Sequence, residues 1–146
     1  MNLKTLCREL GEYARSMALI NHSSAGASLG ELNPLSVEWY PMLHIIPAGT
    51  HVARENTTRF GLAIYYLDRL LEDNSNAVDI FSSSVENLKN LLVAAKSMPG
   101  VVAVQEQYTI RNFMPEKMDD RLAGAYAEVW VEVMNDTLCE DPEVGE

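Results

Sequence analysis

Cysteine is scarce in this sequence, and the two cysteines lie far apart. Cys7 and Cys139 stand near opposite ends of the 146-residue chain, without the Cys-x-x-Cys spacing of a zinc or redox site. This usage indicates neither a disulfide framework nor a metal centre, and it is typical of thiols in a reducing compartment. We therefore expect two free cysteines.

Long apolar runs are missing as well. No run approaches the roughly 18 residues that a membrane-spanning helix requires. Near the N-terminus, Arg8, Glu9 and Glu12 interrupt the stretch where a signal peptide needs an apolar core. We expect a protein that neither crosses a membrane nor is secreted.

Positively charged residues are also few. The chain has 11 lysines and arginines against 21 acidic residues, which gives a formal net charge of −10, and its arginines are scattered singly. Because nucleic-acid-binding proteins gather their cations on one face, we expect no specific binding of DNA or RNA. The acids concentrate at the end of the chain, which predicts a solvated acidic tail over residues 136–146. Residues 1–135 are expected to form a single domain.

Catalytic signatures are also lacking. The sequence contains no dinucleotide-binding glycine pattern, no phosphate-binding loop and no nucleophile elbow. His22, His44 and His51 do not have the spacing that fixes two metal ligands on one face. Glu128 and Glu132 share a predicted strand face, but at a separation of roughly 13 Å they are too far apart to act on one bond. We expect no enzyme, no metal and no cofactor.

Hydrophobic spacing predicts two helices, over residues 2–20 and 77–98, where apolar residues recur three and four positions apart. Residues 21–36, rich in small and polar residues, are expected to form one long loop. The strand signals are a hairpin of residues 37–46 and 51–55 around a turn at 47–50, a central strand over 59–67, and strands over 101–110 and 124–134.

This order of elements predicts an α+β fold. Its strands are joined mainly by short turns, and two helices can lie together on one side, so we expect an antiparallel sheet of about four to five strands with both helices packed on one face. The last strand is the most regular. One side carries small and β-branched residues for the core, whereas the other mixes Tyr126 and Trp130 with Glu128 and Glu132. Such a mixture is typical of a surface that meets a partner; the alternative is that the loop at 21–36 half covers the aromatic rings.

The sequence resembles the tail-terminator and head-to-tail connector ring proteins of tailed bacteriophages, ring proteins of crAss-like phages among them. The likeness lies in the order of elements across most of residues 1–135 and in three segments: FGLAIYYLD at 60–68, DNSN at 73–76 before the long helix, and RLAG at 121–124 before the last strand. It carries no catalytic residues.

The resemblance implies a virion protein, assembled in the cytoplasm of a bacterial host. It would be a non-enzymatic subunit of a homo-oligomeric ring, such as a hexamer or dodecamer, at the head-tail junction or the end of the tail tube. Its partners would be further copies of itself and the portal, connector or tail proteins. DNA would pass through the ring without specific binding, and a negatively charged subunit would repel the phosphates.

We expect identical subunits to associate head to tail into a closed ring. The contacts are assigned to the mixed face of the last strand and to the hairpin at 37–55, with large aromatic residues as buried anchors and arginines paired with glutamates across subunits. The residues assigned to this interface are Tyr126, Glu128, Trp130, Glu132, Arg54, Arg59 and Arg121.

Two other classes of function stay open. One is a small cytosolic α+β module that binds a ligand between a helix and the sheet, which would require a pocket with converging polar groups. The other is an adaptor that binds an unrelated protein through residues 21–36. Rings or concentration-dependent oligomers in solution would favour a ring protein over these two classes.

Overall fold

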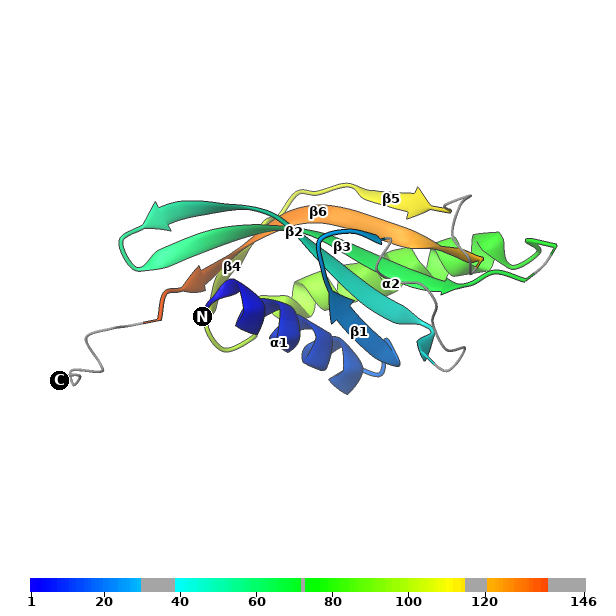
Figure 1. Cartoon of the computed structure of the whole chain (residues 1–146), viewed down its shortest axis with the longest axis horizontal. Helices are drawn as coiled ribbons and strands as arrows, with labels where there is room; N and C mark the ends of the chain where they lie inside the picture. Colours follow the sequence, from blue (N-terminus) through cyan, green and yellow to red (C-terminus); the bar gives the residue numbers. More distant parts are fainter. Residues whose placement is uncertain (30–38, 72, 115–120, 137–146) are drawn as a thin grey trace.

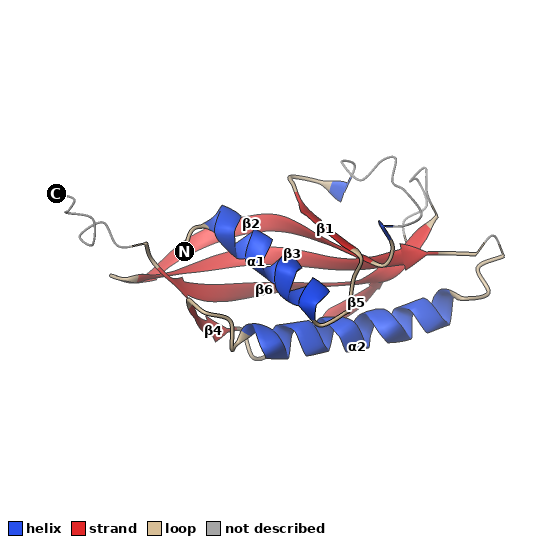
Figure 2. Cartoon of the chain, turned by 90° about the horizontal axis from the view of Figure 1, so that it is seen from below, coloured by secondary structure: helices blue, strands red, loops and turns tan. Residues whose placement is uncertain are grey.

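The computed structural model describes residues 1–29, 39–71, 73–114 and 121–136, and these form an α+β fold (Figure 1). The elements are α1 (Leu3–Ser16), β1 (His22–Ala25), β2 (Met42–Arg54), β3 (Thr57–Arg69), α2 (Ala77–Ala95), β4 (Val101–Val104), β5 (Ile110–Phe113) and β6 (Leu122–Met134). Both helices lie on one side of the sheet, below it in Figure 1 and in front of it in Figure 2. The predicted fold class is confirmed.

In the part of the chain that the structure describes, the sheet has six strands in the order β1-β2-β3-β6-β4, with β5 also paired to β6. The long strands β2, β3 and β6 are antiparallel neighbours, whereas β1 runs parallel to β2. β6 pairs with β3 along its whole length on one edge and with the short strands β4 and β5 on the other. It therefore lies inside the sheet although it is the last of the described strands in sequence order.

The core lies between the helices and the sheet. Alternate residues of β6 point toward the helices because successive side chains of a strand face opposite sides, and Ala125, Ala127, Val129 and Val131 are all buried there. The other large side chains of the core come mainly from the apolar stripes of α1 and α2 and from β2 and β3. They are Leu6, Leu10, Leu43, Ile45, Leu62, Ile64, Leu88, Leu91 and Leu92. The predicted core side of the last strand is thus confirmed.

The predicted hairpin turn at 47–50 is wrong. β2 runs continuously from Met42 to Arg54, and the turn lies at residues 55–56, so the hairpin joins β2 to β3. Pro47 is tolerated within β2 because β1 pairs with β2 only as far as Ile45. The stretch of β2 around Pro47 therefore has no outer neighbour among the described residues, so the missing N–H of the proline breaks no hydrogen bond there. A register shift between Pro47 and Gly49 accommodates the irregular stretch.

Three further expectations are corrected. The predicted loop at 21–36 contains β1, which adds a parallel pair to a sheet expected to be wholly antiparallel. In place of the single strand predicted over 101–110, the chain forms β4 and then, after residues 105–109, β5, which begins only at Ile110; the sheet accordingly has more strands than expected. Residues 30–36 of the loop and 137–146 of the acidic tail lie outside the described residues.

Candidate interaction surface

The face of the sheet that points away from α1 and α2, here called the open face, carries two side-chain clusters. The first is an aromatic cluster of Tyr65 on β3, Tyr126 on β6 and Phe113 on β5. The two tyrosine rings stack with centroids 4.8 Å apart, and Phe113 meets them edge-on at 5.1 and 6.0 Å. All three are half-buried. The three rings can meet because β5 lies directly beside β6 at this end of the sheet.

The second is a charged cluster of Arg59, Trp130 and Glu132. The Arg59 guanidinium lies 4.0 Å from the centre of the Trp130 ring, and its Nε donates a hydrogen bond to Glu132 Oε1 at 3.0 Å. The arginine holds the pKa of Glu132 below its ordinary value, and the Thr57 hydroxyl acts in the same direction. The carboxylate is buried yet stays ionised at neutral pH because a cation stands against it.

The structure brings four of the seven predicted interface residues to one face of one strand: Tyr126, Glu128, Trp130 and Glu132 lie on the open side of β6. Arg59 joins them from β3, where its partner in the register is Glu132. The hypothesis paired such residues across subunits, but Arg59 and Glu132 already form their ion pair within the chain.

The other predicted arginines lie at opposite ends of the sheet. Arg54 is exposed at the end of β2 beside the hairpin turn, on the same end as the charged cluster. Arg121 precedes β6 at the far end, where its guanidinium contacts the side-chain oxygen of Asn74. Arg121 is therefore separated from Glu132 by nearly the whole length of β6.

A small polar hollow adjoins the aromatic cluster. It has a volume of about 280 Å³ and is lined by Gln105, Gln107, Tyr108, Thr109, Arg111, Tyr126 and Glu128. It forms where β4 has ended and β5 has not begun, so the edge of β6 is covered there by a loop. Gln105 bridges that gap: its backbone donates to the Trp130 carbonyl, and its side-chain oxygen accepts from the Trp130 amide.

His44 is buried on β2. Its Nδ1 lies 2.7 Å from Ser24 Oγ and its Nε2 lies 3.0 Å from the Ser28 carbonyl oxygen. Because a carbonyl can only accept, Nε2 carries a proton and donates; in the neutral imidazole, Nδ1 then accepts from the serine hydroxyl. The sequence did not reveal this contact, since β1 was not predicted. Among the described residues, no three histidine, cysteine or acidic side chains are grouped to hold a metal ion.

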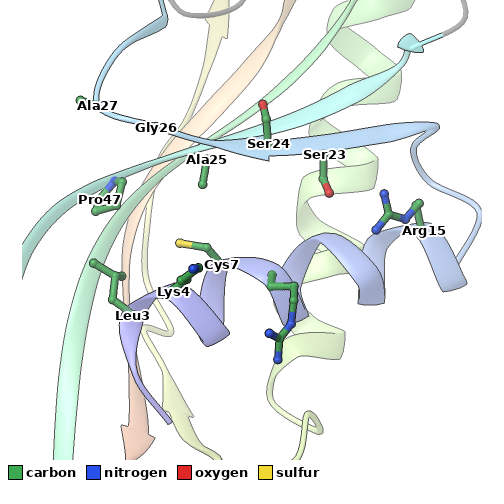
Figure 3. A pocket seen from close by; sticks show the side chains of 11 residues that line it. Leu3, Lys4, Cys7, Arg15, Ser23, Ser24, Ala25, Gly26, Ala27 and Pro47 are labelled. Carbon is green, nitrogen blue, oxygen red and sulfur yellow. The ribbon is translucent and has the colours of Figure 1, made fainter.

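A groove lies between α1 and β1, with a volume of about 760 Å³ (Figure 3). Its lining is Leu3, Lys4, Cys7, Arg8, Arg15, Ser23, Ser24, Ala25, Gly26, Ala27 and Pro47. Figure 3 shows Cys7 projecting from α1 on the side of β1, with Lys4 beside it. Burial raises the pKa of the Cys7 thiol, which therefore stays protonated at neutral pH and is a poor nucleophile. None of the described lining residues is acidic.

No protein-family model matches this sequence, and no curated protein matches it significantly. In the part of the chain that the structure describes, no helix is long and apolar enough to cross a membrane.

Proposed function

We propose that this protein is a non-enzymatic structural subunit of a bacteriophage particle that assembles into a homo-oligomeric ring at the head-tail junction or the tail-tube end. The observation that carries the proposal is the open face, where half-buried aromatic rings and charged side chains lie together on the side of the sheet opposite both helices. Aromatic residues and arginine are enriched in the centres of protein interfaces.

A second feature favours association between copies. Residues 47–56, here called the arm, form the end of the β2–β3 hairpin, and nearly all of them are exposed. The arm includes Val52, whose side chain is 71% exposed, and Figure 1 shows it extending past the N-terminal end of α1. The arm and the open face are two different surface patches. When one patch of a subunit contacts the other patch of the next identical subunit, the repeated contact generates a ring if the rotation between subunits closes.

The charge of the chain is compatible with a channel for DNA. A net charge of −10 gives a surface that repels phosphate groups, so DNA would slide past rather than adhere. The proposed partners are copies of the same chain and the neighbouring portal, connector or tail proteins, and the proposed location is the virion.

The test is the mass of the purified protein by light scattering over a range of concentrations, with electron microscopy of the heaviest species. We expect rings, or oligomers that grow with concentration. Glu128→Arg reverses an exposed charge on the open face and should weaken association, as should Trp130→Ala. Val78→Arg changes an exposed valine on α2, on the helix side, and should leave association unchanged.

Two results would contradict the proposal. If Glu128→Arg and Trp130→Ala both assemble like the wild type, the open face is not the interface. If the wild-type protein stays monomeric at every concentration, self-association is not a property of this chain.

The groove between α1 and β1 favours a second candidate, a small ligand-binding module. Its volume of about 760 Å³ lies within the range of small-molecule sites, and its lining combines apolar residues with Lys4, Arg8 and Arg15. Such a protein would be a monomer whose thermal unfolding temperature rises with an anionic small molecule. A ring protein would show assembly without that ligand-dependent rise.

A further inference from the structure

The outer edge of β2 is only partly covered. β1 pairs with β2 as far as Ile45, and from there to Arg54 the strand has no outer neighbour among the described residues. A bare strand edge carries backbone N–H and C=O groups that can pair with another chain, and natural proteins commonly protect it with lysine, proline or a bulge. Pro47 protects the beginning of this stretch, but the part from Gly49 to Arg54, within the arm, contains neither lysine nor proline.

The register shows which backbone groups on β2 point away from β3. The Gly26 amide donates to the Ile45 carbonyl at 3.1 Å, so the backbone groups of Ile45 point to the outer edge. Its partner on β3 is Ile64, and these two residues therefore form no hydrogen bonds with each other. Hydrogen-bonded and non-hydrogen-bonded pairs alternate along an antiparallel ladder, so every second residue of β3 from Ile64 is in the same position.

This alternation leaves two residues of the arm with free backbone groups. Phe60 and Thr58 follow Ile64 at steps of two along β3, and they stand opposite Thr50 and Val52. The N–H and C=O groups of Thr50 and Val52 therefore point to the outer edge, where no described strand accepts them.

The free edge is complementary to itself. Thr50 and Val52 lie one residue on either side of His51. When a second copy of the strand runs antiparallel about a two-fold axis at His51, Thr50 of each copy stands opposite Val52 of the other. Each of these pairs exchanges both of its backbone hydrogen bonds, so the outward groups are all satisfied. A pair of facing β-branched side chains also stabilises the contact between strands.

The pairing would also cover an exposed apolar side chain. Val52 is 71% exposed. It lies on the same side of the strand as Thr50, whose partner Phe60 belongs to the core between the sheet and the helices. The arm extends past the end of α1, so no helix covers that side here (Figure 1). Thr50 of the second copy would take that place beside Val52.

The charges near the edge do not oppose the pairing. His51, on the axis, carries no fixed charge. Arg54 would stand opposite Ala48 of the second copy, which places the two copies of Arg54 roughly 20 Å apart. Arg59, the neighbour of His51 on β3, would lie three strand spacings or roughly 14 Å from its own copy. Both separations exceed the Debye length of about 8 Å at physiological salt.

We propose that the edge of β2 from Gly49 to Arg54 binds the same edge of a second copy of this chain, antiparallel about a two-fold axis at His51, so that two sheets join into one. Another protein could add a strand to such an edge, but the symmetric position of the outward groups about His51 favours the copy. The inference does not depend on ring assembly, because the ring contact runs through the open face.

Disulfide formation on the axis tests the pairing. In a background of Cys7→Ser and Cys139→Ser, His51→Cys would place each thiol in a non-hydrogen-bonded pair with its copy. The Cα atoms of such a pair lie about 4.5 Å apart, within the range of a disulfide. The matched control is Ala48→Cys, which is exposed on the same arm but would lie roughly 20 Å from its copy.

The readout is the rate at which covalent dimer forms with air as the oxidant and micromolar protein. We expect His51→Cys to cross-link at least about tenfold faster than Ala48→Cys, because a docked thiol meets its copy at millimolar rather than micromolar effective concentration. Glu128→Arg, which tests the open face, should leave the His51→Cys rate unchanged.

Val52→Lys tests the same contact without cysteines. A lysine on an edge strand opposes the addition of another strand, and the site is exposed, so the circular dichroism spectrum should be unchanged. We expect this variant to lose the dimer that light scattering detects in the wild type. Val93→Lys, at an exposed valine on α2, should retain it.

Equal cross-linking rates for His51→Cys and Ala48→Cys would overturn the proposal, as would cross-linking that Glu128→Arg abolishes. Association that Glu128→Arg weakens and Val52→Lys does not would also reject the edge contact, while it would leave the ring contact through the open face in place.

Discussion

The substitution Gly124→Ala tests the close approach of β3 and β6. Gly124 lies opposite Leu67 in the antiparallel register. A Cβ at this position would stand 1.7 Å from the carbonyl oxygen of Tyr66 and 3.0 Å from the Cα of Leu67. Both contacts are with backbone, so no side-chain rotation relieves them, and the strands must separate by more than an ångström.

The magnitude follows from the hydrogen bonds that such a separation breaks. Each net backbone hydrogen bond contributes about 1 kcal/mol, and a buried group left unpaired costs about 1–3 kcal/mol. Loss of two neighbouring ladder bonds therefore lowers the free energy of unfolding by about 3 kcal/mol. With a urea m-value of about 2 kcal/mol per molar, the unfolding midpoint falls by roughly 1.5 M.

The assay is urea denaturation followed by circular dichroism, with Gly49→Ala as the matched control. Gly49 lies in the arm, and a Cβ there meets nothing within 4 Å. Alanine restricts the unfolded chain, so this control should be more stable by about 0.4–1 kcal/mol. A Gly124→Ala midpoint within about 0.3 M of the wild type would refute the strand separation that the argument requires.

Three further substitutions test the charged cluster and the core. The pKa of Glu132 is held below its ordinary 4.5 by Arg59, so its stabilisation is fully present above that value and lost as the pH falls through the lower folded pKa. Glu132→Gln should therefore lower the thermal midpoint at pH 7, and the gap from wild type should narrow in acid; a constant gap would contradict the ion pair. The Ser84 hydroxyl is fully buried without a hydrogen-bond partner among the described residues, so Ser84→Ala should raise the free energy of unfolding by about 1 kcal/mol in urea titrations. The Tyr66 hydroxyl donates to a carbonyl at 2.7 Å and accepts from an amide at 2.8 Å, so Tyr66→Phe should lower that free energy by about 1–2 kcal/mol, and an unchanged value would contradict those bonds.

The sequence was sufficient for the features that depend on local periodicity. The apolar spacing in 77–98 corresponds to α2, and the alternation in 124–134 assigns each side chain of β6 to the correct face. The mixed face of β6 followed from that alternation, so the open-face glutamates and aromatic residues were found without knowledge of the neighbouring strands.

Features that depend on pairing between distant segments were not found. Pro47 and Gly49 read locally as a turn, but pairing with β3 keeps this stretch extended. β1 has few apolar residues, and its existence rests on parallel pairing with β2. The Arg59–Glu132 ion pair depends on the register of β3 against β6, which single-strand patterns do not determine. The groove was missed for the same reason, because one of its walls is β1.

The position of β6 inside the sheet has a consequence for how the protein is made. A ribosome releases Leu122–Met134 after every other strand, yet β3, β4 and β5 all require β6 as their hydrogen-bonded neighbour. Until that strand emerges, the nascent chain exposes the unpaired edge of β3, a surface that favours aggregation. This domain is therefore expected to fold only once β6 has emerged, and a premature stop before residue 122 should leave a fragment that chaperones and proteases recognise rather than a smaller folded domain.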